Sequence, residues 1–230
     1  MWMWMCDVVC AWSRRDEGTI LFDNFPPTAN ATTLHARLAK LFATDPRHSQ
    51  PGFVNETLAI YPPANFTDHD HASRYWWAGV RLFGDLAMSC AARRTARWVS
   101  NITLRAADAA DAYLYFLKRK LRVTALAEEV SSVPYGVFHG SELPLVFDSV
   151  RLLLDGDEKE IALDVMALWA AFADTGKPDA SLRVSRGGGM PLWPRYDPMS
   201  DEALVIDHPV SVASGLKKAE CDYWDRVHGW

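Results

Sequence analysis

A run of six apolar residues, Ala112-Tyr-Leu-Tyr-Phe-Leu117, limits the folds open to this chain. The run is short, rich in aromatic side chains and bounded by charged residues, a pattern typical of a central β-strand rather than a helix. Residues 7–12 form a second short apolar run, which is rich in β-branched side chains and ends in a polar turn over residues 13–18. Residues 203–207 form a third such run, so the sequence predicts three strands.

Longer segments between these runs carry apolar residues at helical spacing. They cover residues 34–42, with Thr32 and Thr33 as candidate caps, residues 72–99 and residues 159–173. The third segment is followed by Gly176 and then by proline, which is how many helices end, because glycine accepts a positive φ and proline cannot extend the helix.

The rest of the chain is expected to be mostly irregular. Residues 43–70 are rich in Pro, Asn and Asp, and predict a loop with one short helical turn at most. Residues 183–189 read as an exposed loop, and a short helix holding Cys221 and Trp224 closes the chain. The alternation of strands and helices favours an α/β layered architecture.

Composition narrows the functional classes. With 230 residues, of which 49% are hydrophobic, the chain can bury the core of one globular domain. A net charge of −5 with scattered Lys and Arg argues against binding to nucleic acid or to an anionic membrane surface. We find no apolar stretch of the roughly 18 residues that a membrane-spanning helix needs.

Four N-glycosylation sequons point to the secretory pathway. A single Asn-x-Ser/Thr match arises easily by chance, whereas four such matches within the first half of the chain indicate a glycosylating, extracellular route. The apolar start of the chain does not resemble a signal peptide, because it lacks a basic region and a small-residue cleavage site. We therefore expect that the parent protein is secreted and that its true N-terminus lies upstream. The sequon asparagines are Asn30, Asn55, Asn65 and Asn101.

Five motifs together resemble one enzyme family. Each is weak alone, but their order and rough spacing are similar to those of type-B carboxylesterases and cholinesterases. The resemblance implies an α/β-hydrolase fold, a small-molecule carboxylic ester as substrate, and no cofactor. It also implies that residues 1–230 form one partial, C-terminal portion of the domain, in which residues 1–6 are a non-native start. The motifs are Arg15-Asp-Glu-Gly-Thr19, Tyr135-Gly-Val-Phe-His-Gly-Ser-Glu-Leu-Pro-Leu-Val-Phe147, Trp169-Ala-Ala-Phe-Ala-Asp-Thr-Gly-Lys-Pro178, Trp193-Pro-Arg-Tyr196 and Cys221-Asp-Tyr-Trp224.

The resemblance assigns two members of a catalytic triad. Glu17 would be the acid and His139 the general base, in the chain order of α/β-hydrolases. Serine becomes a good nucleophile only when an imidazole accepts its proton, and a carboxylate on the other ring nitrogen orients that imidazole. Glu142 resembles a family position that helps to hold the histidine loop in place.

Two further assignments concern cysteines and metals. By resemblance, Cys90 and Cys221 form a disulfide, which requires an oxidising compartment. His69 and His71 could chelate a metal, but no third ligand is near them in the sequence, so a solvated loop is the better interpretation and no metal site is predicted.

The nucleophile motif Gly-x-Ser-x-Gly does not occur in these 230 residues. The chain is therefore expected to be inactive as given, either as a truncated product or as a fragment that needs a partner, with its oligomeric state open. A non-catalytic, cholinesterase-like adhesion module and a non-functional remnant are the alternatives. The presence of both Glu17 and His139 favours descent from an enzyme, because a binding scaffold needs neither.

Overall fold

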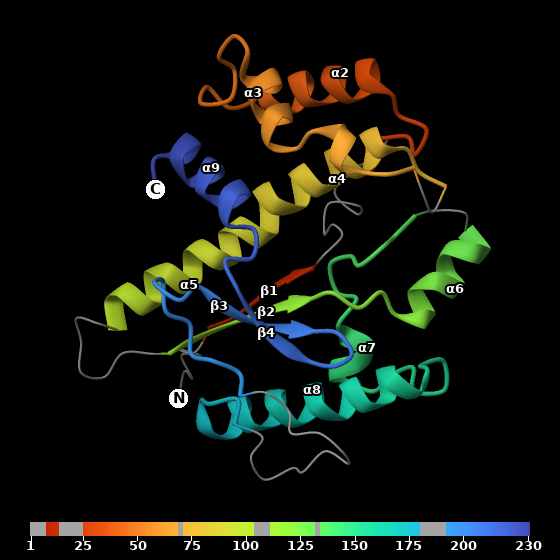
Figure 1. Cartoon of the computed structure of the whole chain (residues 1–230), viewed down its shortest axis with the longest axis vertical. Helices are drawn as coiled ribbons and strands as arrows, with labels where there is room; N and C mark the ends of the chain where they lie inside the picture. Colours follow the sequence, from red (N-terminus) through yellow and green to blue (C-terminus); the bar gives the residue numbers. More distant parts are fainter. Residues whose placement is uncertain (1–7, 14–24, 69–70, 104–110, 132–133, 180–191) are drawn as a thin grey trace.

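The computed structural model describes residues 8–13, 25–68, 71–103, 111–131, 134–179 and 192–230. Within these ranges groups of helices separate β1, β2 and β3 along the chain, and β4 follows β3 directly (Figure 1). The strands are β1 (Val8–Ser13), β2 (Ala112–Leu117), β3 (Glu202–Ile206) and β4 (Ser211–Ser214). The helices are α2 (Ala31–Phe42), α3 (Phe53–Ile60), α4 (Arg74–Gly84), α5 (Cys90–Thr103), α6 (Arg122–Ser131), α7 (Leu143–Val146), α8 (Gly156–Thr175) and α9 (Lys218–His228), with a 3₁₀ turn η1 (Pro63–Asn65) and a π-helical segment η2 (Asp85–Ser89).

The four described strands form one mixed sheet in the order β1-β2-β3-β4. Strands β1, β2 and β3 are parallel, with Val8 opposite Ala112 and Tyr115 opposite Leu204, whereas β4 runs antiparallel to β3. Parallel neighbours need a long crossover, and α6 to α8 supply it between β2 and β3. The three predicted strands are confirmed, and the molecule is a mixed α/β structure that is mostly helical.

Helices cover both faces of this sheet (Figure 1). Alternate residues of a strand point to opposite faces, and β2 divides its side chains accordingly. Leu114 and Phe116 pack in a core with α2, α4 and α9, whereas Tyr113 and Tyr115 pack in a second core with α7 and α8. All six residues of β2 are buried, which explains the uninterrupted apolar run.

The long helix expected over residues 72–99 is present, but it is not uniform. It comprises α4 and α5 joined by the π-helical η2. Residues at helical spacing along it face the core, since Gly79, Leu82 and Cys90 are buried. At Gly79 a Cβ would lie 2.9 Å from Cδ1 of Leu34 and 3.0 Å from the Phe25 ring, so glycine allows α2 to pack closely.

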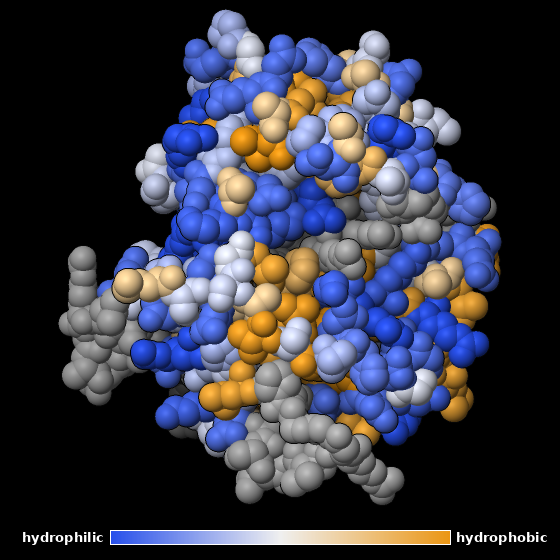
Figure 2. Space-filling view, in the orientation of Figure 1, coloured by the Kyte–Doolittle hydropathy of each residue, from blue (hydrophilic) through white to orange (hydrophobic). Residues whose placement is uncertain are grey.

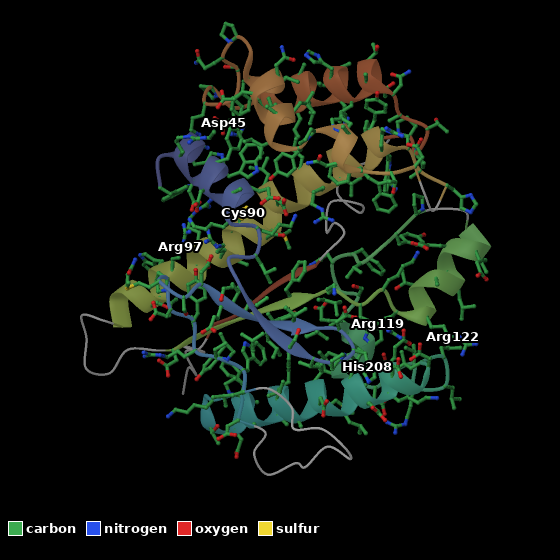
Figure 3. All side chains as sticks on the ribbon, viewed as in Figure 1. Asp45, Cys90, Arg97, Arg119, Arg122 and His208 are labelled. Atoms are coloured by element: carbon green, nitrogen blue, oxygen red, sulfur yellow. A yellow bond between two sulfur atoms is a disulfide. The ribbon has the colours of Figure 1, made fainter. Side chains whose placement is uncertain are left out.

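An ionic cluster fastens α9 to α5. Arg93 is almost fully buried and pairs with Asp201 and Asp222, and Arg97 bonds Asp222 at 3.0 Å and Asp225 at 2.9 Å. Burial of a guanidinium is costly unless carboxylates compensate its charge, and here they do so from two segments. In Figure 3, Arg97 and Cys90 both lie on α5.

The loop expected over residues 43–70 is wrong in part, because this segment contains α3 and η1. The helix forms through contacts distant in sequence. Phe53 and Thr57 are buried, and the Thr57 hydroxyl lies 2.8 Å from the Tyr223 hydroxyl on α9. A helix of eight residues depends on such packing for its stability.

Other helix boundaries also differ from the expectation. Asn30, rather than Thr32 or Thr33, caps α2, and its side chain accepts a hydrogen bond from the Thr33 amide at 2.9 Å. The predicted end of α8 is confirmed, since Gly176 is the C-cap with φ 74°. Helix α6 and edge strand β4 have no counterpart in the sequence prediction. The loop expected over residues 183–189 lies outside the described residues.

The face shown in Figure 2 is largely hydrophilic, with apolar side chains gathered over β4 and the neighbouring part of the sheet. Strand β4 pairs with β3, and its Val212 and Ala213 stay half-buried. No described helix is long and apolar enough to cross a membrane.

Candidate active site

The segment over residues 134–142, here called the His139 loop, follows α6 and leads into α7. Both of its glycines have a positive φ, Gly136 at 63° and Gly140 at 84°. Residues with a Cβ rarely adopt this backbone conformation. Val137 lies between them and is 1% exposed, so it anchors the loop in the core that contains α8. Beyond this anchor, the Ser141 amide donates to the Phe138 carbonyl at 3.0 Å and closes a turn around His139.

His139 is exposed at the tip of this turn. An imidazole in such a position can reach a group on another segment, which a general base must do. The predicted acid Glu17 lies outside the described residues, as do Asp16 and His69. The pairing of Glu17 with His139 therefore stays a prediction.

The two residues after Gly140 have different environments. Ser141 is 3% exposed, and within the described residues its hydroxyl has no hydrogen-bond partner, so it is buried rather than presented as a nucleophile. Glu142 is the N-cap of α7 without a side-chain cap hydrogen bond, and its carbonyl accepts from the amides of Leu145 and Val146 at 2.8 and 3.0 Å. The role predicted for the Glu142 carboxylate stays a prediction.

A carboxylate that the sequence did not point out contacts the start of the His139 loop. Glu128, on α6, is 7% exposed. Its Oε1 accepts from the backbone N–H groups of Tyr135 at 2.8 Å and Gly136 at 2.6 Å, and its Oε2 pairs with the Lys120 ammonium. The sequence signal for this residue is weak: two acidic residues at 128 and 129, in a segment for which the sequence predicts no helix.

The N-terminal end of α8 is held by a second set of charges (Figure 3). Asp155 and Glu158 form a capping box, and Arg119 bonds the Asp155 carboxylate at 2.9 Å. The Glu158 carboxylate also accepts from the Arg122 amide at 2.7 Å, which ties the start of α6 to α8. Hydrogen bonding from the Glu158 amide, and then the nearby Arg119, lower the pKa of Asp155.

A histidine pair lies elsewhere, between the loop after α2 and the end of α9. The Nε2 atoms of His48 and His228 are 2.9 Å apart, and the His48 ring stacks on Phe53 and meets Trp224 edge-on. Burial, more than any nearby charge, lowers the pKa of both histidines. Within the described residues no group of three or more His, Cys, Asp or Glu could hold a metal ion.

A cavity of about 180 Å³ lies among α3, η1, α4 and the start of α9, and no residue of the His139 loop lines it. The buried Lys217 ammonium there pairs with Asp85 at 2.8 Å, and burial lowers its pKa. The lining residues are Ile60, Tyr61, Pro62, Asn65, Phe66, Arg81, Lys217 and Glu220.

The predicted disulfide is present. Cys90 on α5 and Cys221 on α9 are bonded, with their Cα atoms 4.9 Å apart. The four sequon asparagines, Asn30, Asn55, Asn65 and Asn101, are all exposed, although Thr57 of the second sequon is buried.

The sequence profile of the carboxylesterase family matches residues 15–224, which is most of the chain. This chain belongs to the carboxylesterase family. The resemblance seen in its motifs is therefore confirmed. Membership implies the α/β-hydrolase fold, with which a parallel sheet core covered by helices on both faces agrees.

Individual relatives match over a shorter stretch. Carboxylesterase 4A of Bos taurus is 33% identical over 95 residues, which is 40% of this chain and 16% of that protein. Acetylcholinesterase of Gallus gallus is 34% identical over 95 residues, 40% of the chain and 12% of the relative. Carboxylesterase 1D of Mus musculus is 38% identical over 88 residues, 37% of the chain and 14% of the relative. Each match thus spans only a small part of the relative's length.

Proposed function

We propose that this chain is the acid- and histidine-bearing part of a carboxylic ester hydrolase that works through an acyl-enzyme. Family membership supports a small carboxylic ester as the substrate class. The observation that carries the proposal is the placement of His139, which is exposed on a loop whose two ends are fixed in the protein. This is the arrangement that a general base needs.

In this mechanism His139 accepts the proton of a serine hydroxyl as the hydroxyl attacks the ester carbonyl, and then gives the proton to the leaving alcohol. Glu17 accepts a hydrogen bond from the other ring nitrogen, fixes the tautomer and stabilises the imidazolium. These 230 residues contain no Gly-x-Ser-x-Gly. The nucleophile would therefore come from a further segment, joined to this chain or associated with it.

Secretion and a partial, C-terminal domain over residues 1–230 are parts of the same proposal. Four exposed sequon asparagines and a disulfide support passage through an oxidising, glycosylating compartment. After expression through a secretory pathway, mass spectrometry with and without enzymatic deglycosylation should find occupied sites among Asn30, Asn55, Asn65 and Asn101. Free asparagine at all four would count against secretion.

The chemical test has two arms. The chain alone should hydrolyse p-nitrophenyl acyl esters no faster than buffer, because it has no nucleophile elbow. When it is joined to the serine-bearing segment of a carboxylesterase relative, the fusion should hydrolyse these esters. In that fusion His139→Ala and Glu17→Gln should each lower kcat by roughly 10³-fold or more.

His35→Gln is the matched control, because His35 is exposed on α2. It should leave kcat unchanged. An active fusion that loses nothing on His139→Ala would contradict the assigned role. A fusion that folds and binds esters without turnover would favour the adhesion-type alternative.

A further inference from the structure

We infer that Glu128 is a positioning residue for the His139 loop, and that Lys120 and Glu128 together set where the imidazole is presented. The catalytic meaning of this inference rests on the function proposed for His139. The structural claim about the loop stands on the contacts of Glu128 alone.

The contacts join three segments at one carboxylate. Lys120 follows β2, Glu128 lies on α6, and the amides of Tyr135 and Gly136 open the His139 loop. Each oxygen has a separate task, since Oε1 accepts from both backbone N–H groups and Oε2 pairs with the ammonium. The loop entrance is thereby tied to the central strand of the sheet.

Burial makes this arrangement strong. Glu128 is 7% exposed, and a carboxylate leaves water only where charged or polar donors replace the lost solvation. Two backbone N–H donors and a lysine do so here. Hydrogen bonds to an ionised acceptor are about twice as strong as those between neutral groups. Loss of the side chain at position 128 would remove the acceptor of the Tyr135 and Gly136 amides, whereas glutamine would keep a weaker, uncharged acceptor.

The anchored amides lie close to His139 along the chain. Gly136 is three residues before it, and the positive φ of Gly136 sets the direction in which the loop leaves the anchor. The next residue, Val137, is itself held in place by apolar packing. A displacement of about 1 Å in a catalytic group can lower a rate by about 10²-fold. The loop entrance sets the position of the His139 imidazole, so the rate of the proposed reaction should depend on it.

Neighbouring residues on α6 provide the control. Glu129 has the same chemistry on the same helix but is exposed. Glu128→Ala removes the anchor, and Glu129→Ala removes a carboxylate that does not contact the loop in the structure. Glu128→Gln keeps the length of the side chain while removing its charge, and serves if the alanine variant fails to fold.

The experiment is amide hydrogen exchange by NMR on the 230-residue chain, combined with the Cε1–H resonance of His139. In Glu128→Ala the exchange of the Tyr135 and Gly136 amides should quicken at least tenfold, and the His139 resonance should move toward that of an unstructured peptide. Glu128→Gln should give a smaller change in the same direction. Glu129→Ala should leave both readouts unchanged, and the amides of Ala112–Leu117 should stay protected in every variant.

Unchanged protection at Tyr135 and Gly136 in Glu128→Ala would overturn the inference. So would an equal loss in Glu129→Ala, or an equal loss across Ala112–Leu117, because either would mean a general loss of stability. None of these readouts depends on hydrolysis. An inactive fusion would therefore contradict the proposed function without affecting the conclusion about Glu128.

Discussion

Replacing Cys90 and Cys221 by alanine should lower the free energy of unfolding by about 6 kcal/mol. The disulfide joins residues 131 positions apart, and the entropy of closing a loop of that size in the unfolded chain corresponds to about 5 kcal/mol at 25 °C. Both cysteines are at most 1% exposed, so loss of the two buried sulfurs adds a packing term on the order of 1 kcal/mol. The ionic contacts of Arg93 and Arg97 remain, and α9 should stay docked on α5.

Urea unfolding at equilibrium measures this loss. The oxidised protein, the same protein with its disulfide reduced, and the double alanine variant should be compared. The reduced protein keeps both sulfurs, so its difference from the oxidised protein isolates the cross-link, and its difference from the variant isolates packing. The slope of free energy against urea should also rise without the cross-link, because the unfolded chain then exposes more surface.

A difference below about 1 kcal/mol between oxidised and reduced protein would refute the loop-entropy reasoning. It would mean that the unfolded chain is already restricted by other structure. A large loss confined to the alanine variant would instead assign the stabilisation to the packing of the sulfurs.

Two further predictions concern ionisable side chains that the fold buries wholly or in part. Burial lowers the pKa of His48 and His228 below 6.5, so the unfolded chain binds more protons in mildly acid solution, and stability should fall from about pH 7.5 to pH 5.5. His228→Gln should flatten this dependence in thermal melts while His35→Gln leaves it intact, and equal slopes in all three proteins would contradict the assignment. Asp201→Asn keeps a residue that tolerates the positive φ of 50° but removes the main partner of buried Arg93, so it should cost about 3 kcal/mol in urea unfolding. A cost within error of zero would show that Asp222 alone compensates the guanidinium.

The parts of the fold that local patterns encode could be read from the sequence. Six consecutive apolar residues predict the buried strand Ala112–Leu117, and Gly176 predicts the end of α8. The pairing of Cys90 with Cys221 also followed, although only through family resemblance. His139 is assigned by the same resemblance, and its role as general base stays a prediction.

The rest depends on contacts between distant segments. Helix α3 is stabilised by the contact of Thr57 with Tyr223, 166 residues later in the chain. The spacing of apolar residues within residues 43–70 does not predict that contact. The importance of Glu128 could not be read from the sequence either, because it arises when α6 turns back on the chain and brings a carboxylate to the amides of Tyr135 and Gly136. A charged residue on a short helix is usually solvent-facing, and only the fold shows that this one is buried.

The sequon asparagines are unevenly distributed around the sheet. All four lie on or beside α2, α3, η1 and α5, on one side of the sheet, whereas α7 and α8 on the opposite side carry none. Attached glycans would shield one hemisphere of the molecule from proteases and from other proteins. The bare hemisphere, which also holds the anchor of the His139 loop, would be the side left open for assembly with another polypeptide.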